Sequence, residues 1–250
     1  MIIRYAVVET LRTKAAFLGP VFLFAMLYLI EFSFWSKLTA EAGIAHYKQE
    51  TIIHYLLWSV LIFQITAVSG LPDELAVYIE NGQIERFLLL PTGVLRFFLA
   101  YGLGQMLARL LLFSPLILCI MLIKGAGNFV LLPVLLTAGL LINICLSFSL
   151  SCLSFTFREA YSLVTIKDTL AWVLSGALIP LDLFPVLVQH VFAFLPFQYI
   201  SFIPAQAAMG RSGHDLFLPH LAAVLLSMLT IAHYSWKYLS KYNQAYVSYD

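Results

Sequence analysis

Residues 94–123 read VLRFFLAYGLGQMLARLLLFSPLILCIMLI, and the charged residues in this run are Arg96 and Arg109. An apolar run of about 18 residues or more with so few charges is long enough to cross the hydrocarbon core of a bilayer, about 30 Å thick, as a helix. This run exceeds that length. It therefore predicts a transmembrane helix that tilts or protrudes from the membrane.

The rest of the chain continues the same composition. Of its 250 residues, 62% are hydrophobic and 11% are charged, against about 25% charged residues in an ordinary soluble domain. A soluble fold cannot bury that much apolar surface, so we expect one all-α integral membrane domain over residues 1–250. Its six transmembrane helices are predicted at 15–34, 52–71, 94–123, 129–157, 163–181 and 216–238.

Three further segments are predicted between or before these spans. Residues 1–14 combine apolar positions at helical spacing with charges on the other faces, which is typical of a helix lying in the membrane interface. Residues 72–90 are charged but keep a helical spacing of apolar residues, which predicts a short cytoplasmic helix. In the outer region 183–210, closely spaced prolines favour re-entrant half helices between spans five and six over a seventh crossing.

The distribution of charge sets the orientation and excludes some partners. Lys and Arg gather on one side of the six-span layout, which predicts that both termini are cytoplasmic. The formal net charge is +1, and no basic patch is large enough to hold phosphates, so no nucleic-acid partner is expected. The surrounding lipid bilayer is the expected environment.

A few polar residues interrupt the predicted spans. Arg109 lies about 20 Å along the helix from Arg96, and its nearest polar neighbour on that face is Gln105. A charge at this depth must face the bundle interior or a wet cavity. A role in the substrate path or gate and a structural pairing between helices both remain open. Glu31 is expected to reach water from a span end, and Lys167 with Asp168 to form the wet start of span five.

Motifs for catalysis are absent from the sequence. There is no GxxxxGK[ST] loop, no GxSxG elbow, no HExxH pair and no GxGxxG fingerprint. We therefore expect no catalytic residue, no metal site and no cofactor in this chain.

Two stretches resemble a known family, the ABC-2 type permeases. Residues 78–91, YIENGQIERFLLLP, are similar to the loop before the third span of that family through Glu80, Gly82, Glu85, the leucines and Pro91. Asn81 and Gln83 stand where the family pattern is loose. Residues 175–180, SGALIP, together with the later prolines, look like the proline-rich outer region of the same family.

This resemblance implies the membrane subunit of a bacterial ABC exporter in the inner membrane. The segment 72–90 would be the coupling helix that docks on a separate ATPase, and ATP and Mg would be bound by that partner. The chain would pair with a second copy or a sister permease and move a hydrophobic or amphipathic substrate. The implied residues are Glu74, Glu80, Gly82, Glu85 and Arg86 for coupling, Gln105 and Arg109 for the path or gate, and Gly176, Pro180, Pro185, Pro196 and Pro204 for the outer motif.

Two alternatives remain at this point. A secondary transporter driven by an ion gradient would carry internal repeats and intramembrane carboxylates near the midplane. A non-transporting membrane scaffold would have no use for the charged helix before span three.

Overall fold

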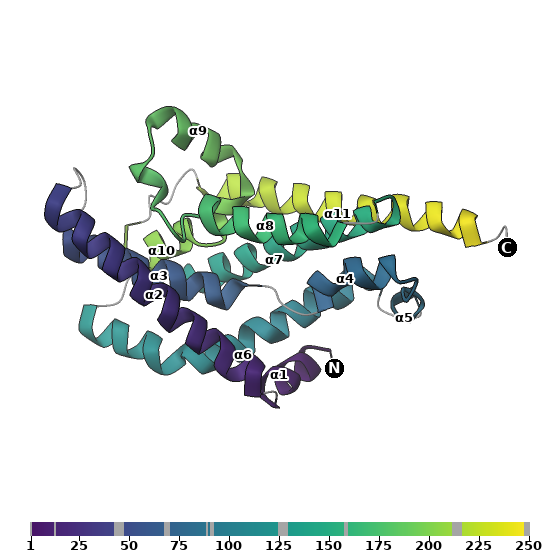
Figure 1. Ribbon diagram of the computed structural model, residues 1–250, viewed down its shortest axis with the longest axis horizontal. Coiled ribbons are helices and arrows are strands. Elements are labelled where there is room, and N and C mark those ends of the chain that lie inside the picture. Colours follow the sequence, from purple (N-terminus) through teal and green to yellow (C-terminus); the bar gives the residue numbers. More distant parts are fainter. Residues whose placement is uncertain are drawn as a thin grey trace.

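The computed structural model describes residues 2–12, 14–42, 48–67, 71–88, 90, 93–124, 130–157, 160–211 and 217–247, and these residues form helices joined by turns (Figure 1). The α-helices are α1 Ile2–Arg12, α2 Lys14–Ala42, α3 Gln49–Thr66, α4 Leu71–Glu80, α5 Glu85–Leu88, α6 Val94–Lys124, α7 Leu132–Ser151, α8 Ala160–Leu174, α9 Val186–Phe194, α10 Phe202–Ala208 and α11 Phe217–Val247. Short 3₁₀ helices are η1 Cys152–Phe155, η2 Leu181–Leu183 and η3 Pro196–Tyr199.

Four stretches of the described helices have the length and apolar composition of a membrane span: Leu18–Thr39, Val94–Ile123, Leu132–Phe155 and Leu218–Tyr238. A fifth is possible if Val186–Phe194 and Pro196–Ala208, bent by 79°, are taken together as a broken span or a re-entrant loop. The remaining two predicted spans correspond to α3, with 18 residues, and α8, with 15. At 1.5 Å per residue these helices are about 27 Å and 22 Å long, shorter than the bilayer core.

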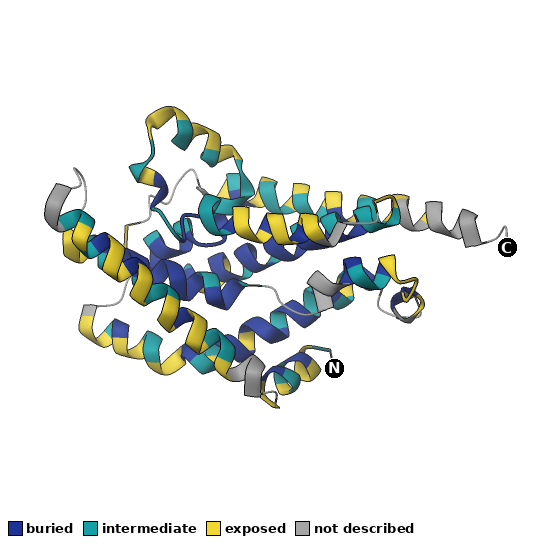
Figure 2. Ribbon diagram, viewed as in Figure 1, coloured by how far each residue is buried: buried dark blue, intermediate teal, exposed yellow. Residues whose placement is uncertain are grey.

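The centre of the bundle is formed by α3 and α7, with α2 and α11 on the outside (Figure 2). In an apolar window of 18 residues within Leu132–Phe155, 67% of the residues are buried, against 17% for the window in Leu18–Thr39 and 11% for that in Leu218–Tyr238. The outer helices instead expose large apolar side chains such as Phe22, Leu29 and Leu226. An exposed apolar surface of this extent is unfavourable in water, whereas lipid tails cover it at little cost in free energy.

The predicted N-terminal helix is present as α1, and it packs closely against α6. A Cβ atom added to Gly104 would lie 2.6 Å from the Cβ atom of Ala6 and 2.6 Å from the carbonyl oxygen of Ile3. Tyr101 on α6 also donates a hydrogen bond of 3.2 Å to the carboxylate of Glu9. A glycine on α6 thus lets the two backbones touch, as at helix crossings in membranes.

The helix predicted over 72–90 is divided into α4 and α5. Residues 81–84 form a turn between them, in which Gly82 has φ of 68°. A left-handed backbone conformation ends the first helix, since glycine adopts it at little cost. In Figure 1, α4, α5 and the C-terminal end of α11 lie toward one end of the bundle, and α9 and α10 toward the other.

The prediction that span five runs to residue 181 is wrong, because α8 ends at Leu174 and a non-helical segment, 175–180, follows. Three consecutive carbonyls there accept hydrogen bonds from side chains of α2 and α3. Tyr55 donates to Gly176 at 2.6 Å, Ser59 to Ala177 at 3.3 Å, and the indole of Trp35 to Leu178 at 3.3 Å. These side chains replace the bonds that a continuing helix would have made.

Gly176 is the residue that allows this break. Its φ is 80°, and an added Cβ atom would lie 2.9 Å from the Cβ atom of Phe202, 3.0 Å from the hydroxyl of Tyr55 and 3.1 Å from Leu181. Any other residue would therefore meet both backbone strain and a clash with fixed parts of the core.

We predict that Gly176→Ala lowers the thermal midpoint of the purified protein in detergent by roughly 5–10 °C, since strain and overpacking together cost about 2–4 kcal/mol. Gly82→Ala is the matched control. Gly82 has a similar φ of 68° but nothing within 4 Å of an added Cβ atom, so only the strain remains and the fall should be smaller. Equal falls in the two variants would show that the packing around Gly176 does not matter.

Candidate functional site

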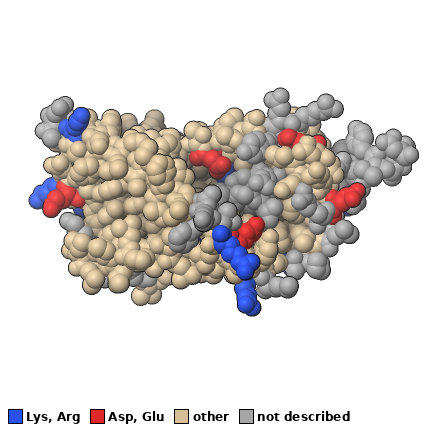
Figure 3. Space-filling model, turned by 60° about the horizontal axis from the view of Figure 1, so that its bottom comes forward, with Lys and Arg blue, Asp and Glu red and all other residues tan. Residues whose placement is uncertain are grey.

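The residues predicted for coupling lie on the exposed edge of the α4–α5 turn. Glu80, Gly82 and Glu85 are exposed, whereas the side chains of Glu74 and Arg86 lie outside the described residues. Ser154 donates a hydrogen bond of 3.4 Å to the carboxylate of Glu80. Figure 3 shows a broad uncharged area on one side of the view, with charged side chains at its outer edge and others near the middle of the face and on the far side of it.

Beneath this edge, α4 is anchored in the bundle. Leu75, Ala76 and Ile79 are buried, and α4 packs against α7, η1 and α8. The segment therefore presents acid and amide groups to one side and an apolar face to the central helices. A displacement of α4 is transmitted directly to those helices, because packed apolar contacts resist compression.

Arg109, predicted for the path or gate, binds the end of α3. Its guanidinium is 6% exposed, and Nη1 donates to the carbonyl oxygens of Gln64, at 3.2 Å, and Ala67. The last carbonyls of a helix carry partial negative charge and lack helical partners, so a buried cation is stabilised there. Gln105 is also buried and hydrogen-bonds Tyr101.

A second buried cation, Lys167, joins α7 to α8. Its ammonium group donates to Asn143 at 3.0 Å and to Ser147 at 2.7 Å, and it forms an ion pair with Asp168. Asn143 in turn donates to the carbonyl oxygen of Thr66, at 3.3 Å, near the end of α3. The network thus ties three helices together.

The expectation that Lys167 is wet is wrong, because it is 4% exposed, while Asp168 remains 49% exposed. The sequence did contain a signal for this network. Asn143 and Ser147 stand one helical turn apart within a mostly apolar span, which places two hydrogen-bonding side chains on one face.

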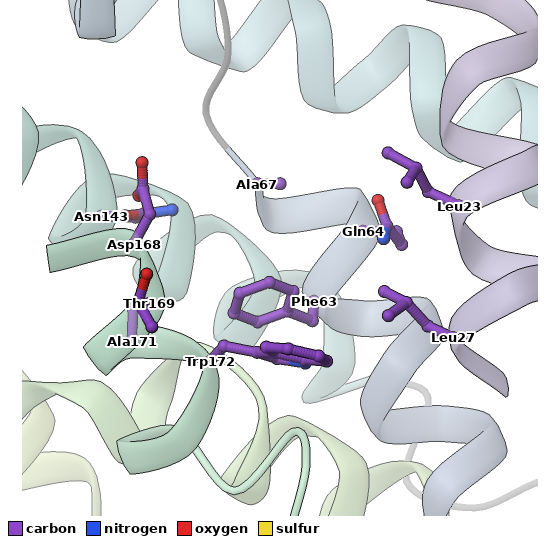
Figure 4. Close-up of a pocket in the computed structure, with 10 residues that line it drawn as sticks. All are labelled: Leu23, Leu27, Phe63, Gln64, Ala67, Asn143, Asp168, Thr169, Ala171 and Trp172. Carbon is purple, nitrogen blue, oxygen red and sulfur yellow. The ribbon is translucent and has the colours of Figure 1, made fainter. Parts of the chain in front are cut away.

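A cavity of about 360 Å³ opens beside this network (Figure 4). Its walls come from α2, α3, α7 and α8, and the residues are Leu23, Leu27, Phe63, Gln64, Ala67, Asn143, Asp168, Thr169, Ala171 and Trp172. In Figure 4 the rings of Phe63 and Trp172 lie side by side, apart from the polar groups of Asn143 and Asp168. The cavity therefore offers an apolar aromatic part and a polar part to one occupant.

Arg109 holds two residues of the cavity wall through their backbone carbonyls. The two residues whose carbonyls it binds, Gln64 and Ala67, are themselves part of the cavity wall. Arg109 thus positions the wall through the end of α3.

The outer motif residues lie at helix starts and in the turn after α8. Pro180 and Pro185 immediately precede η2 and α9, Pro196 opens η3, and Pro204 lies in the first turn of α10. Proline is tolerated at these places because the first N–H groups of a helix have no helical partner. Together with Gly176 they divide the segment after α8 into short helices.

The prediction that Glu31 reaches water from the end of a span is wrong. Glu31 is 2% exposed instead of reaching water, and neither carboxylate oxygen has a hydrogen-bond partner among the described residues. Glu31 also lies in the wall of a second cavity.

We predict that Arg109→Met lowers the thermal midpoint in detergent by roughly 5 °C, because the charged hydrogen bonds at the end of α3, worth about 2 kcal/mol, are lost. Arg96→Met, on the same helix at an exposed position, is the control and should leave the midpoint unchanged. An unchanged midpoint in Arg109→Met would contradict the capping role and leave a role in gating.

Comparison with known proteins agrees with the resemblance noted in the sequence. A comparison with curated proteins gives no significant match. The family model described as ABC-2 family transporter protein matches residues 22–245, which include all four walls of the cavity, the α4–α5 turn and the outer motif. The match covers most of the chain, and the protein is therefore a multi-pass membrane protein that belongs to the ABC-2 family of transporters.

Proposed function

We propose that this chain is the permease subunit of an ATP-driven exporter in a bacterial plasma membrane. A separate ABC ATPase binds ATP and Mg, and the permease pairs with a second copy of itself or a sister permease to move a hydrophobic or amphipathic substrate. The observation that carries the proposal is the exposed acidic turn between α4 and α5, seated on the central helices. Family membership supports it.

In this proposal the chain crosses the membrane six times, with both termini in the cytoplasm. The short helices α3 and α8 count as crossings, α1 lies in the interface, and α9 with α10 forms the outer re-entrant region. The layout is supported by the arrangement in Figure 1, where α4, α5 and the end of α11 lie away from α9.

The coupling route runs through α8. A motor subunit that engages Glu80 and Glu85 pushes on α4, which packs against α8. Asp168, Thr169 and Trp172 of α8 line the larger cavity. Movement of the motor therefore reaches the cavity wall through one helix contact, and Arg109 holds the opposite wall at the end of α3.

The lining of the cavity supports an amphipathic substrate. Phe63 and Trp172 offer aromatic surface, and Asn143 and Asp168 offer polar groups, within about 360 Å³. A small amphipathic molecule places its two parts against these two kinds of wall.

We predict that Glu80→Lys combined with Glu85→Lys reduces the amount of ATPase subunit that co-purifies with the permease by at least about tenfold, because reversed charges at an interface cost more than the roughly 1.4 kcal/mol that a tenfold loss requires. The measurement is affinity capture in mild detergent, followed by mass spectrometry and an ATP hydrolysis assay.

The control is Glu50→Lys, an exposed acidic residue in the first turn of α3, which this proposal assigns to the outer side. It should leave the captured ATPase unchanged. Full recovery of a stimulated ATPase with the double variant would refute the proposed interface.

An ion-driven transporter is the second candidate, and the buried carboxylate of Glu31 is the observation that favours it. Transport by the purified chain in liposomes decides between the two. Uptake that requires the ATPase and ATP supports the exporter, whereas uptake driven by an imposed ion gradient alone supports the second candidate.

A further inference from the structure

The carboxylate of Glu31 is buried in an apolar part of the molecule. It lies within Leu18–Thr39, is 2% exposed, and has no hydrogen bond to either oxygen among the described residues. The buried cation Lys167 pairs with Asp168 and not with Glu31. A polar group buried without a partner is costly, and an ionisable residue inside a membrane marks a functional site by default.

A cavity of about 290 Å³ lies beside Glu31. Its wall is formed by Ile30, Glu31, Phe34 and Trp35 of α2 and by Leu178 and Ile179 of the non-helical segment after α8. The carbonyl of Leu178 is already bonded to Trp35. Glu31 is the residue of this wall with an ionisable side chain, and its carboxylate oxygens are covered by neighbouring atoms instead of lying open to the cavity.

The aromatic residues of the wall are of the kind that attracts a cation. The ring centroids of Phe34 and Trp35 are 5.5 Å apart, and the two ring planes are nearly perpendicular, at 85°. Aromatic faces beside a carboxylate are the surroundings in which proteins bind ammonium groups, since ring quadrupole and carboxylate both attract positive charge. A glutamate has three rotatable side-chain bonds, so its carboxylate reaches an occupant of the cavity by changing rotamer.

We propose that this cavity binds the amine or quaternary ammonium group of an organic cation with an apolar body. The proposal rests on the proposed export function, and it names the class of substrate. A neutral amphiphile would leave the Glu31 carboxylate without a partner, whereas an ammonium group supplies both the charge and the contact that it lacks.

Both cavities are lined by residues of α2. Leu23 and Leu27, which line the larger cavity, precede Glu31 by two turns and one turn on the same helix face. Asp168 brings a partly exposed carboxylate to the larger cavity. An organic cation moving along this face of α2 therefore meets a carboxylate in each cavity.

The test uses the purified full chain in lipid nanodiscs and two probes of the same shape, benzyltrimethylammonium and its neutral counterpart neopentylbenzene. Binding is measured by titration calorimetry, with empty nanodiscs subtracted. We expect the cation to bind the wild-type protein about tenfold more tightly than the neutral probe, and Glu31→Gln to abolish that difference. Glu50→Gln, which changes an exposed carboxylate, should preserve it.

A second variant guards against a folding defect. Ile179→Trp fills the cavity without removing Glu31, and it should lower the binding affinity for the cation by about tenfold. The elution volume and the thermal midpoint of each variant report whether it is folded. Undiminished binding to Glu31→Gln, or equal binding of the two probes to the wild type, overturns the proposal. Because no ATPase is present, loss of this binding is distinguishable from loss of motor capture.

Discussion

The structure depends on one constraint, that backbone carbonyls inside an apolar bundle must be bonded even where a helix stops. Two such helix ends among the described residues are those of α8 and α3. After α8, Tyr55, Ser59 and Trp35 donate to three consecutive carbonyls, and at the end of α3, Arg109 donates to Gln64 and Ala67. Without water, each of these carbonyls would otherwise cost several kcal/mol. Trp35, Tyr55, Ser59 and Arg109 therefore have a structural role. Both cavities lie where helices end.

The sequence predicts the long helices well, and it fails where hydrogen bonds between distant segments decide. Residues 94–123 are apolar over a length that only a spanning helix satisfies, and α6 follows that prediction. The apolar run after Leu174 looks the same in composition, yet it leaves the helix because Gly176 takes a left-handed conformation and the donors at 35, 55 and 59 are in reach. Hydropathy does not record such donors. The break is encoded in residues more than a hundred positions away.

Charge was the other source of error. The adjacent Lys167 and Asp168 predict a wet helix start, but Lys167 turns inward to Asn143 and Ser147 while Asp168 stays partly exposed. Two neighbouring residues on a helix point in directions about 100° apart, so they need not share an environment. Glu31 was misplaced because its distance from the span end suggested water, whereas Trp35 and the segment after α8 cover it. In both cases burial was decided by packing partners that are remote in the sequence.

These contacts also distinguish one wall of the cavities from the others. The Lys167 network joins α7 and α8, and Asn143 extends it to α3, so these helices are held together by satisfied polar contacts that are strong in an apolar medium. From α2, Trp35 donates a hydrogen bond to Leu178 in the segment that follows α8, and the residues of α2 that line the larger cavity, Leu23 and Leu27, are apolar. Lipid tails replace apolar contacts at small cost. The helix α2, which lines both cavities, therefore contributes to them apolar side chains whose contacts lipid tails can replace.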